Sequence, residues 1–159
     1  MKDLTITAII KVYQYDELNE ADRSLMKTAM EATARSYAPY SHFSVGAAAL
    51  LNDGTIVTGT NQENAAYPSG LCAERTTLFY ANSQYPDQAV ETLAIAARNE
   101  RGEFLEEPIP PCGACRQVML ELGGAALPVI LGNLAGAVAS TDAAALLPGA
   151  FAPNDLPRA

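Results

Sequence analysis

The sequence predicts one α/β domain, in which helices pack in layers on a central sheet of about five strands. Helical and strand-like hydrophobic patterns alternate along the chain. An Asn-Asp-Gly turn separates two short apolar runs, as in a hairpin. The 159 residues, 49% of them hydrophobic, suffice for one core but not for a second independent domain. We expect residues 1–15 to form an N-terminal arm or an edge strand, and residues 16–159 to form the single domain.

The first half of the chain has the pattern of a helix followed by a hairpin. Asn19, with Asp22 three residues later, is typical of a helix start. Apolar residues then recur at helical spacing until the helix must end before Pro39. The apolar run at 44–51 predicts a buried strand, and the turn after it leads to a second strand at 55–59.

The second half alternates helices and strands. A polar loop at 59–70 is a natural place for ligand contacts. Helices are predicted from Cys72 to about Asn82 and again at 113–122. The remaining expected elements are a strand at 91–97, a charged connection at 98–107, strands at 128–131 and 134–139, and a short helix from a Ser-Thr-Asp cap at 140–142 to Leu147.

Charge and apolar runs exclude two classes of partner. The net charge is −8 and no cluster of Lys or Arg stands out, which argues against nucleic acid, because binding its backbone needs a basic surface. The short apolar run at 6–10 ends at Lys11, and no run approaches the roughly 20 apolar residues of a membrane span. We therefore expect a cytoplasmic protein that binds a small molecule and neither nucleic acid nor a membrane.

All three cysteines lie in two short segments. Cys72 is alone, whereas Cys112 and Cys115 form a C-x-x-C pair. Three thiolates can hold a zinc ion, and tetrahedral zinc then keeps one position for water, as in catalytic sites. Glu74 follows Cys72 by two residues, so it can stand beside the metal and move protons to and from that water. Both segments are expected to begin helices, whose N-termini favour thiolate and carboxylate.

Other interpretations of these residues stay open on the residues alone. His42 can complete a closed structural zinc site, or the C-x-x-C pair can be a redox motif. His42 is otherwise expected to be a hydrogen-bonded structural residue, and Glu74 a carboxylate that merely favours the first turn of a helix. Phe43 and Phe151 would be core aromatic residues by default.

Five ordered motifs together resemble the cytidine deaminase family, in its small, homotetrameric, zinc-dependent form. The resemblance runs from about Asp16 to Leu156. It implies a three-layer α/β/α fold with a central mixed sheet. The motifs are Ala-Pro-Tyr-Ser-x-Phe-x-Val-Gly-Ala-Ala at 38–48, Asn-x-Glu-Asn at 61–64 followed by Tyr67, Cys-Ala-Glu-Arg at 72–75, Pro-Cys-Gly-x-Cys-Arg-Gln at 111–117, and Leu-Leu-Pro-x-x-Phe at 146–151.

The resemblance implies hydrolytic deamination of cytidine and 2′-deoxycytidine to uridine and 2′-deoxyuridine, as in pyrimidine salvage. One Zn²⁺ per subunit would be bound by Cys72, Cys112 and Cys115. Zinc-bound hydroxide would attack C4, with Glu74 as the proton shuttle. Three thiolates leave one net negative charge on the site, which Arg75 is expected to offset by donating to sulfur.

The resemblance also implies a set of substrate contacts and a shared site. Asn61 and Glu63 would hold the ribose hydroxyls, Phe43 would pack on the pyrimidine ring, and Phe151 would reach the active site of a neighbouring subunit in a homotetramer. The full set of expected substrate-binding residues is Phe43, Asn61, Glu63, Ala66, Tyr67, Ala73 and Phe151.

Two alternative functions remain. One is a deaminase of a modified cytosine nucleoside, of the blasticidin S type. The other is a zinc-stabilised module without catalytic activity.

Overall fold

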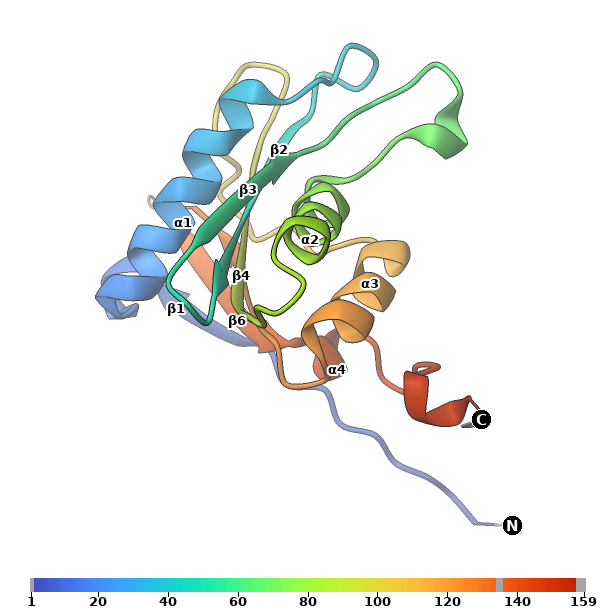
Figure 1. Ribbon diagram of the computed structural model, residues 1–159. Helices are drawn as coiled ribbons and strands as arrows, with labels where there is room; N and C mark the ends of the chain where they lie inside the picture. Colours follow the sequence, from blue (N-terminus) through green and yellow to red (C-terminus); the bar gives the residue numbers. More distant parts are fainter. Residues whose placement is uncertain (1, 134–135, 157–159) are drawn as a thin grey trace.

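The computed structural model describes residues 2–133 and 136–156 and contains a six-stranded mixed sheet with helices on both faces (Figure 1). The strand order is β1-β6-β5-β4-β2-β3, in which β4 and β5 are parallel and every other neighbouring pair is antiparallel. The strands are β1 Lys11–Gln14, β2 Ser44–Leu51, β3 Ile56–Thr60, β4 Val90–Arg98, β5 Pro128–Gly132 and β6 Ala137–Asp142.

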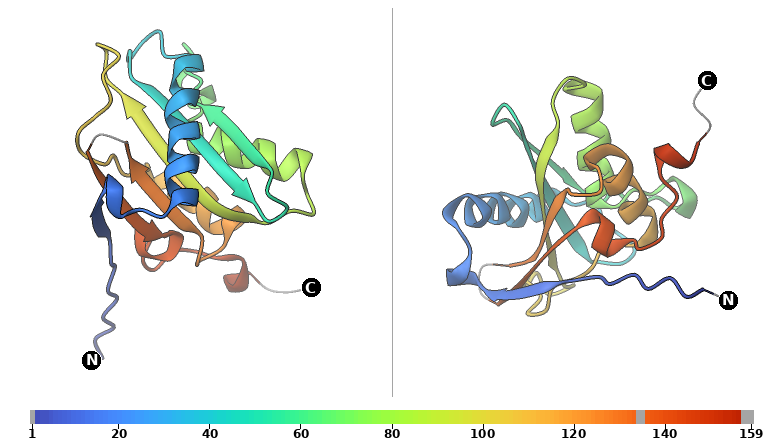
Figure 2. Two further views of the ribbon diagram at one scale, coloured as in Figure 1. Left: turned by 90° about the vertical axis from the view of Figure 1, so that its left-hand side faces the viewer. Right: turned by 90° about the horizontal axis from the view of Figure 1, so that it is seen from below.

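The helices divide between the two faces of this sheet, as Figure 2 shows. One layer contains α1, and the other contains α2 and α3 with the short α4. This confirms the predicted three-layer α/β/α fold, with six strands where about five were expected. The helices are α1 Glu20–Ala32, α2 Ala73–Gln84, α3 Gly113–Gly123 and α4 Ala143–Leu146, and short 3₁₀ turns lie at Tyr15–Glu17, Thr33–Arg35, Tyr67–Ser69 and Pro153–Asp155.

Each face of the sheet has its own buried core. Ala47 and Ala49 of β2 pack in the cluster that contains residues of α2 and α3. Ala48, which lies between them in the sequence, packs in the cluster with Met26 and Ala29 of α1. Successive side chains of a strand point to opposite faces, so a sheet covered on both sides needs a continuous apolar run rather than an alternating one. This explains the run at 44–51.

A glycine allows α1 to approach β2 closely. A Cβ atom at Gly46 would lie 2.2 Å from the carbonyl oxygen of Ala29 in α1. The N-terminus of α1 matches the sequence expectation, because the side chain of Asn19 accepts a hydrogen bond from the backbone N–H of Asp22 at 2.8 Å. The helix ends at Ala32, well before Pro39.

The last strand extends further along the chain than expected. The predicted strand at 134–139 starts on residues 134 and 135, which lie outside the described residues, and β6 runs from Ala137 to Asp142. Its register explains the shift, since Pro128 faces Asp142 across the β5–β6 ladder, so residues 140 and 141 belong to the strand. Asp142 still caps α4, because its side chain accepts from the N–H of Ala145 at 2.7 Å.

The sixth strand comes from the N-terminal segment. Residues 11–14 form β1 at the edge of the sheet, where Lys11 faces Ser140 of β6. Residues 2–10 have no regular secondary structure and are exposed. None of the described helices combines the length and apolar character that crossing a membrane requires.

Candidate active site

Two helix N-termini bring the three cysteines together. Cys72 is the N-cap of α2 and Cys112 is the N-cap of α3, while Cys115 lies in the first turn of α3. The sulfur of Cys112 lies 3.9 Å from that of Cys72 and 3.4 Å from that of Cys115. All three sulfurs lie within 4.8 Å of one another. The predicted convergence of the two helix starts is therefore present in the structure.

This geometry fits a zinc ion. Zn–S bonds of about 2.3 Å in a tetrahedron place sulfurs about 3.8 Å apart, close to the observed separations. Among the described residues, the group that can hold a metal consists of these cysteines alone, and His42 is not part of it. Three protein ligands leave one tetrahedral position open, which is the arrangement of a catalytic zinc site.

The thiol groups of Cys72 and Cys115 shift each other's pKa. A hydrogen bond from the Cys115 thiol, with help from Arg75, lowers the pKa of Cys72 to about 5. The same bond holds the proton on Cys115 and raises its pKa. The Nη2 atom of Arg75 lies 3.9 Å from the Cys72 sulfur and donates to the carbonyl of Gly70 at 3.3 Å. Arg75 is thus placed to offset negative charge on the sulfur cluster.

Glu74 lies in the first turn of α2 and is only 5% exposed. Burial raises the pKa of its carboxyl group above the usual range, because the charged form loses hydration. Glu74 lines the same cavity as Cys72 and Cys112. A carboxylate placed beside a metal site without belonging to it is suited to proton transfer.

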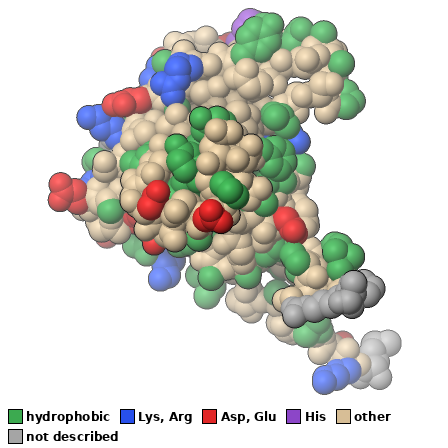
Figure 3. Space-filling model, in the orientation of Figure 1, with side chains coloured by type: hydrophobic (Ala, Val, Ile, Leu, Met, Phe, Trp, Pro, Cys, Tyr) green, Lys and Arg blue, Asp and Glu red, His purple; other side chains and the backbone are tan. Residues whose placement is uncertain are grey.

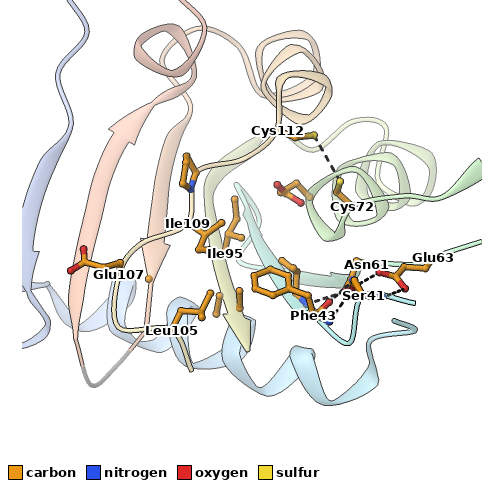
Figure 4. Close-up of a pocket in the computed structure, with 16 residues that line it drawn as sticks. Ser41, Phe43, Asn61, Glu63, Cys72, Ile95, Leu105, Glu107, Ile109 and Cys112 are labelled. Carbon is orange, nitrogen blue, oxygen red and sulfur yellow. Dashed lines mark hydrogen bonds between the residues drawn. The ribbon is translucent and has the colours of Figure 1, made fainter. Parts of the chain in front are cut away.

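A cavity of about 430 Å³ opens from the cysteines (Figure 4). Cys72 and Cys112 lie at one end of it, and Phe43, Asn61 and Glu63 lie at another. Its walls are mostly apolar, as small-molecule sites usually are. The other lining residues are Ser41, Val45, Glu74, Ile95, Ala96, Ala97, Leu105, Glu107, Ile109, Pro110 and Gly132.

Ser41 holds Glu63 in place. Glu63 accepts hydrogen bonds from the backbone N–H groups of Tyr40 at 2.9 Å and Ser41 at 3.2 Å, and also from the Ser41 hydroxyl. The hydroxyl bond is the main cause of the lowered pKa of Glu63. The Ser41 oxygen in turn accepts from the N–H of Phe43 at 3.0 Å. Ser41 therefore links the carboxylate of Glu63 to the backbone of Phe43.

Asn61 is largely engaged within the protein. Its Oδ1 accepts from the N–H of Val45 at 2.8 Å and from the hydroxyl of Ser36. Its Nδ2 donates to the carbonyl of Phe43 at 2.9 Å. An amide nitrogen has two N–H groups, so one donor remains for a ligand. Asn61 thus also fixes the segment that leads into β2.

The other expected substrate residues lie outside this cavity. Ala73 is buried in the core cluster that contains residues of α2 and α3, and Ala66 is exposed on the loop before α2. Tyr67 is exposed and packs edge-on against Tyr40, with ring centroids 6.4 Å apart, beside a neighbouring hollow of about 520 Å³. Phe151 is 60% exposed, and its carbonyl accepts from Nε2 of Gln117 at 2.9 Å.

Sequence reasoning missed several residues of the cavity. Ser41 stands two residues before Phe43 in the quoted motif, and that position was the available signal for its role. Leu105, Glu107 and Ile109 gave no such signal, because the connection between β4 and α3 has no periodic pattern. The stacking of Arg98 on Phe104, with its guanidinium carbon 4.2 Å from the ring centroid, fixes this connection to the end of β4.

Comparisons with known proteins agree with this geometry. A family model described as the cytidine and deoxycytidylate deaminase zinc-binding region matches residues 19–131. The chain belongs to the cytidine and deoxycytidylate deaminase family. Members of this family are zinc-dependent deaminases, and the sulfur cluster of this chain is suited to one zinc ion.

Relatives of this family cover most of the chain. A cytidine deaminase of Halalkalibacterium halodurans is 47% identical over 132 residues, which are 83% of this chain and 95% of that protein. A cytidine deaminase of Mycobacterium tuberculosis is 42% identical over 141 residues, which are 84% of this chain and 92% of that protein. The crystal structure of a cytidine deaminase from Burkholderia pseudomallei is similar with a TM-score of 0.72 and 43% identity, covering 84% of this chain and all of that one.

Removal of one sulfur should remove the metal. We expect Cys112→Ser to lower the zinc content far below one ion per chain, because a neutral hydroxyl replaces a thiolate ligand. Elemental analysis of the purified protein measures this. Ser83→Ala, at the exposed far end of α2, is the control and should keep its zinc. A Cys112→Ser protein that keeps one zinc per chain would contradict the assigned ligands.

Proposed function

We propose that this protein deaminates cytidine and 2′-deoxycytidine to uridine and 2′-deoxyuridine, releasing ammonia, as a step of pyrimidine salvage. The observation that carries the proposal is a cavity with the sulfur cluster and buried Glu74 at one end and Glu63 with Phe43 at another. Relatives that are 42–47% identical are named cytidine deaminases, which supports the same reaction here.

Cys72, Cys112 and Cys115 would hold the zinc ion, which supplies the Lewis acidity that makes water nucleophilic near neutral pH. Arg75 would limit the negative charge that three thiolates bring, through its contact with the Cys72 sulfur. The N-termini of α2 and α3 would act in the same direction, because their free N–H groups favour nearby thiolates.

Glu74 would move two protons during the reaction. It takes the first from the attacking water and delivers it to ring N3, while the oxygen bonds to C4. It then takes the remaining proton from that oxygen and delivers it to the exocyclic nitrogen. The C4–N bond breaks and ammonia leaves, so C4 becomes the carbonyl carbon of uridine. Burial of Glu74 keeps bulk water from competing for these protons.

Residues at the other end of the cavity would orient the nucleoside. Phe43 would pack on the pyrimidine ring, and Glu63 would accept hydrogen bonds from the ribose hydroxyls. Asn61 would contribute the single N–H that its internal bonds leave over. The carbonyl of Pro110, which lines the cavity, would accept from the exocyclic amine.

The proposal includes a homotetramer in which neighbouring subunits complete each site. Phe151 and Tyr67 are exposed and do not line the cavity of their own chain, which supports contact with a neighbour. Hydrophobic side chains gather over the α2 and α3 region among few charged ones (Figure 3), and α2 exposes Phe79 and Tyr80. Ala66 and Ala73 would shape the site through the backbone around Tyr67 and Cys72.

We also propose that residues 16–159 act as one catalytic domain in the cytoplasm. A site made of three thiolates needs a reducing compartment, because oxidation of these cysteines would destroy the ligand set.

The substrate and the role of Glu74 can be tested together. The wild-type protein should convert cytidine and deoxycytidine, and loss of the cytidine ultraviolet band measures this conversion. It should leave CMP, cytosine, adenosine and blasticidin S largely unchanged. Glu74→Gln should lower kcat by about 10²- to 10⁴-fold, because the amide cannot shuttle protons. Its zinc content should not fall. Preference for blasticidin S, or full activity of Glu74→Gln, would overturn the proposal.

A second test separates recognition of the sugar from the chemistry. Ser41→Ala should raise KM for cytidine about tenfold or more while kcat changes less, because Glu63 loses the hydroxyl that orients it. Turnover of 2′,3′-dideoxycytidine, which lacks the 2′- and 3′-hydroxyls that Glu63 would accept from, should change little.

Two further variants serve as controls for this test. Ser41→Thr keeps a hydroxyl and should restore most of the affinity for cytidine, and Ser69→Ala on the exposed loop should behave as wild type. Equal losses for cytidine and the dideoxy analogue would mean that Ser41 supports the whole site rather than Glu63.

A further inference from the structure

Residues 2–12 form an extended, apolar segment that the family domain does not explain. The match to the family model begins at residue 19. The segment leaves the edge of the sheet and passes near Gly149, where an added Cβ atom would lie 3.8 Å from Cδ1 of Ile6. Its free end then points away from the body of the protein (Figures 1 and 2). Its large apolar side chains are mostly in solvent, with Leu4 86%, Ile6 54%, Ile10 51% and Val12 64% exposed.

The side chains of this segment alternate in character. Leu4, Ile6, Ala8, Ile10 and Val12 occupy every second position. In an extended chain these side chains point to one side, so they form a continuous apolar face. The positions between them carry mainly polar or charged residues, with Ile9 as the exception, and are Asp3, Thr5, Thr7, Ile9 and Lys11.

The backbone of the segment is also without partners over most of its length. Within the described parts of the chain, residues 2–8 make no backbone hydrogen bond, and the carbonyl of Ile9 accepts from the Thr141 hydroxyl at 2.9 Å. From residue 11 on, β1 pairs with β6 on one side only, because β1 ends the sheet. An exposed apolar strand with free N–H and C=O groups is a template for pairing with another strand.

We propose that residues 3–11 pair antiparallel with the same residues of a second copy of this chain, about a two-fold axis at Thr7. In this register Asp3 faces Lys11 of the other copy, and Lys11 faces its Asp3, so two opposite-charge pairs form. Leu4 then faces Ile10, and the apolar faces of the two strands join into one. The segment is therefore complementary to itself in both charge and hydrophobicity, which identifies the second copy as its partner.

Neighbouring registers satisfy these conditions less well. A shift by two residues keeps the apolar face but sets Asp3 opposite Ile9 or Tyr13, so the charge pairs are lost. The proposed register also leaves room for both domains, since the two Lys11 residues lie roughly 27 Å apart at about 3.4 Å per residue. This contact uses none of the active-site residues and is independent of the proposed function.

A symmetric cross-link tests the register. Cα atoms that face each other across antiparallel strands lie about 4.5–5.5 Å apart, within the range that a disulfide spans. Thr7→Cys should therefore form a covalent dimer under mild oxidation, seen on a non-reducing denaturing gel. Two Thr5→Cys residues would lie roughly 14 Å apart at the same rise per residue, beyond that range, so this variant is the matched control. The protein without an added cysteine is a second control, because any covalent dimer that it forms must involve Cys72, Cys112 or Cys115.

We expect Thr7→Cys to cross-link about tenfold faster than Thr5→Cys or more, because paired strands hold its thiols at high effective concentration. Adding Asp3→Lys should slow the reaction of Thr7→Cys, and adding Lys11→Asp as well should restore it, since the charge pairs are then re-formed with reversed sign. Equal cross-linking rates for the two cysteine variants would overturn the proposed pairing. So would a Thr7→Cys rate that is unchanged by Asp3→Lys.

Discussion

The arrangement of three sulfurs at two helix N-termini is the constraint on which the rest of the site depends. The crossover from β4 through α3 to the parallel strand β5 fixes where α3 begins, and α2 enters the same layer beside it. Arg116 links the segment before α3 to the end of α4, because it donates to the carbonyls of Pro111 and Leu146, each at 2.7 Å. Cys112 directly follows Pro111, so the position of this sulfur depends on that bridge.

The part of the cavity that contains Phe43, Asn61 and Glu63 lies at the edge of the sheet formed by the carboxyl ends of β4 and β5. Ala97 and Gly132 lie near the carboxyl ends of β4 and β5, where ligands of α/β sheets commonly bind. Because β2 is antiparallel to β4, its start lies at this edge and brings Phe43 there. The end of β3 brings Asn61 there for the same reason. Residues distant in sequence thus meet because of strand direction, and the bonds of Ser41 and Asn61 then fix their orientation.

The sequence predicted those features that local patterns encode. The hairpin, the helix cap at Asn19 and the placement of Cys72 and Cys112 at helix starts follow from turn chemistry and periodicity, and the structure confirms them. The edge strand β1 depends on a partner more than one hundred residues away, and only the register with β6 decides which residues pair. The sequence did not predict that Leu105 lines the cavity, because the connection between β4 and α3 is irregular and has no hydrophobic period.

The division of roles among the substrate residues was predicted only from family resemblance. Nothing in a sequence shows that the oxygen of Asn61 is already occupied by Val45 and Ser36, since those bonds exist only after the strands are paired. The roles of Ala66, Tyr67, Ala73 and Phe151 also stay predictions, because none of these residues lines the cavity of its own chain.

X-ray absorption at the zinc edge of the purified protein is the most direct measurement of the central claim. The arrangement of Cys72, Cys112 and Cys115 predicts three sulfur neighbours at about 2.3 Å and one lighter neighbour at about 2.0 Å, without the scattering pattern of an imidazole ring. A site with four sulfur neighbours, or with a bound histidine, would contradict the account, because no position would then remain for water.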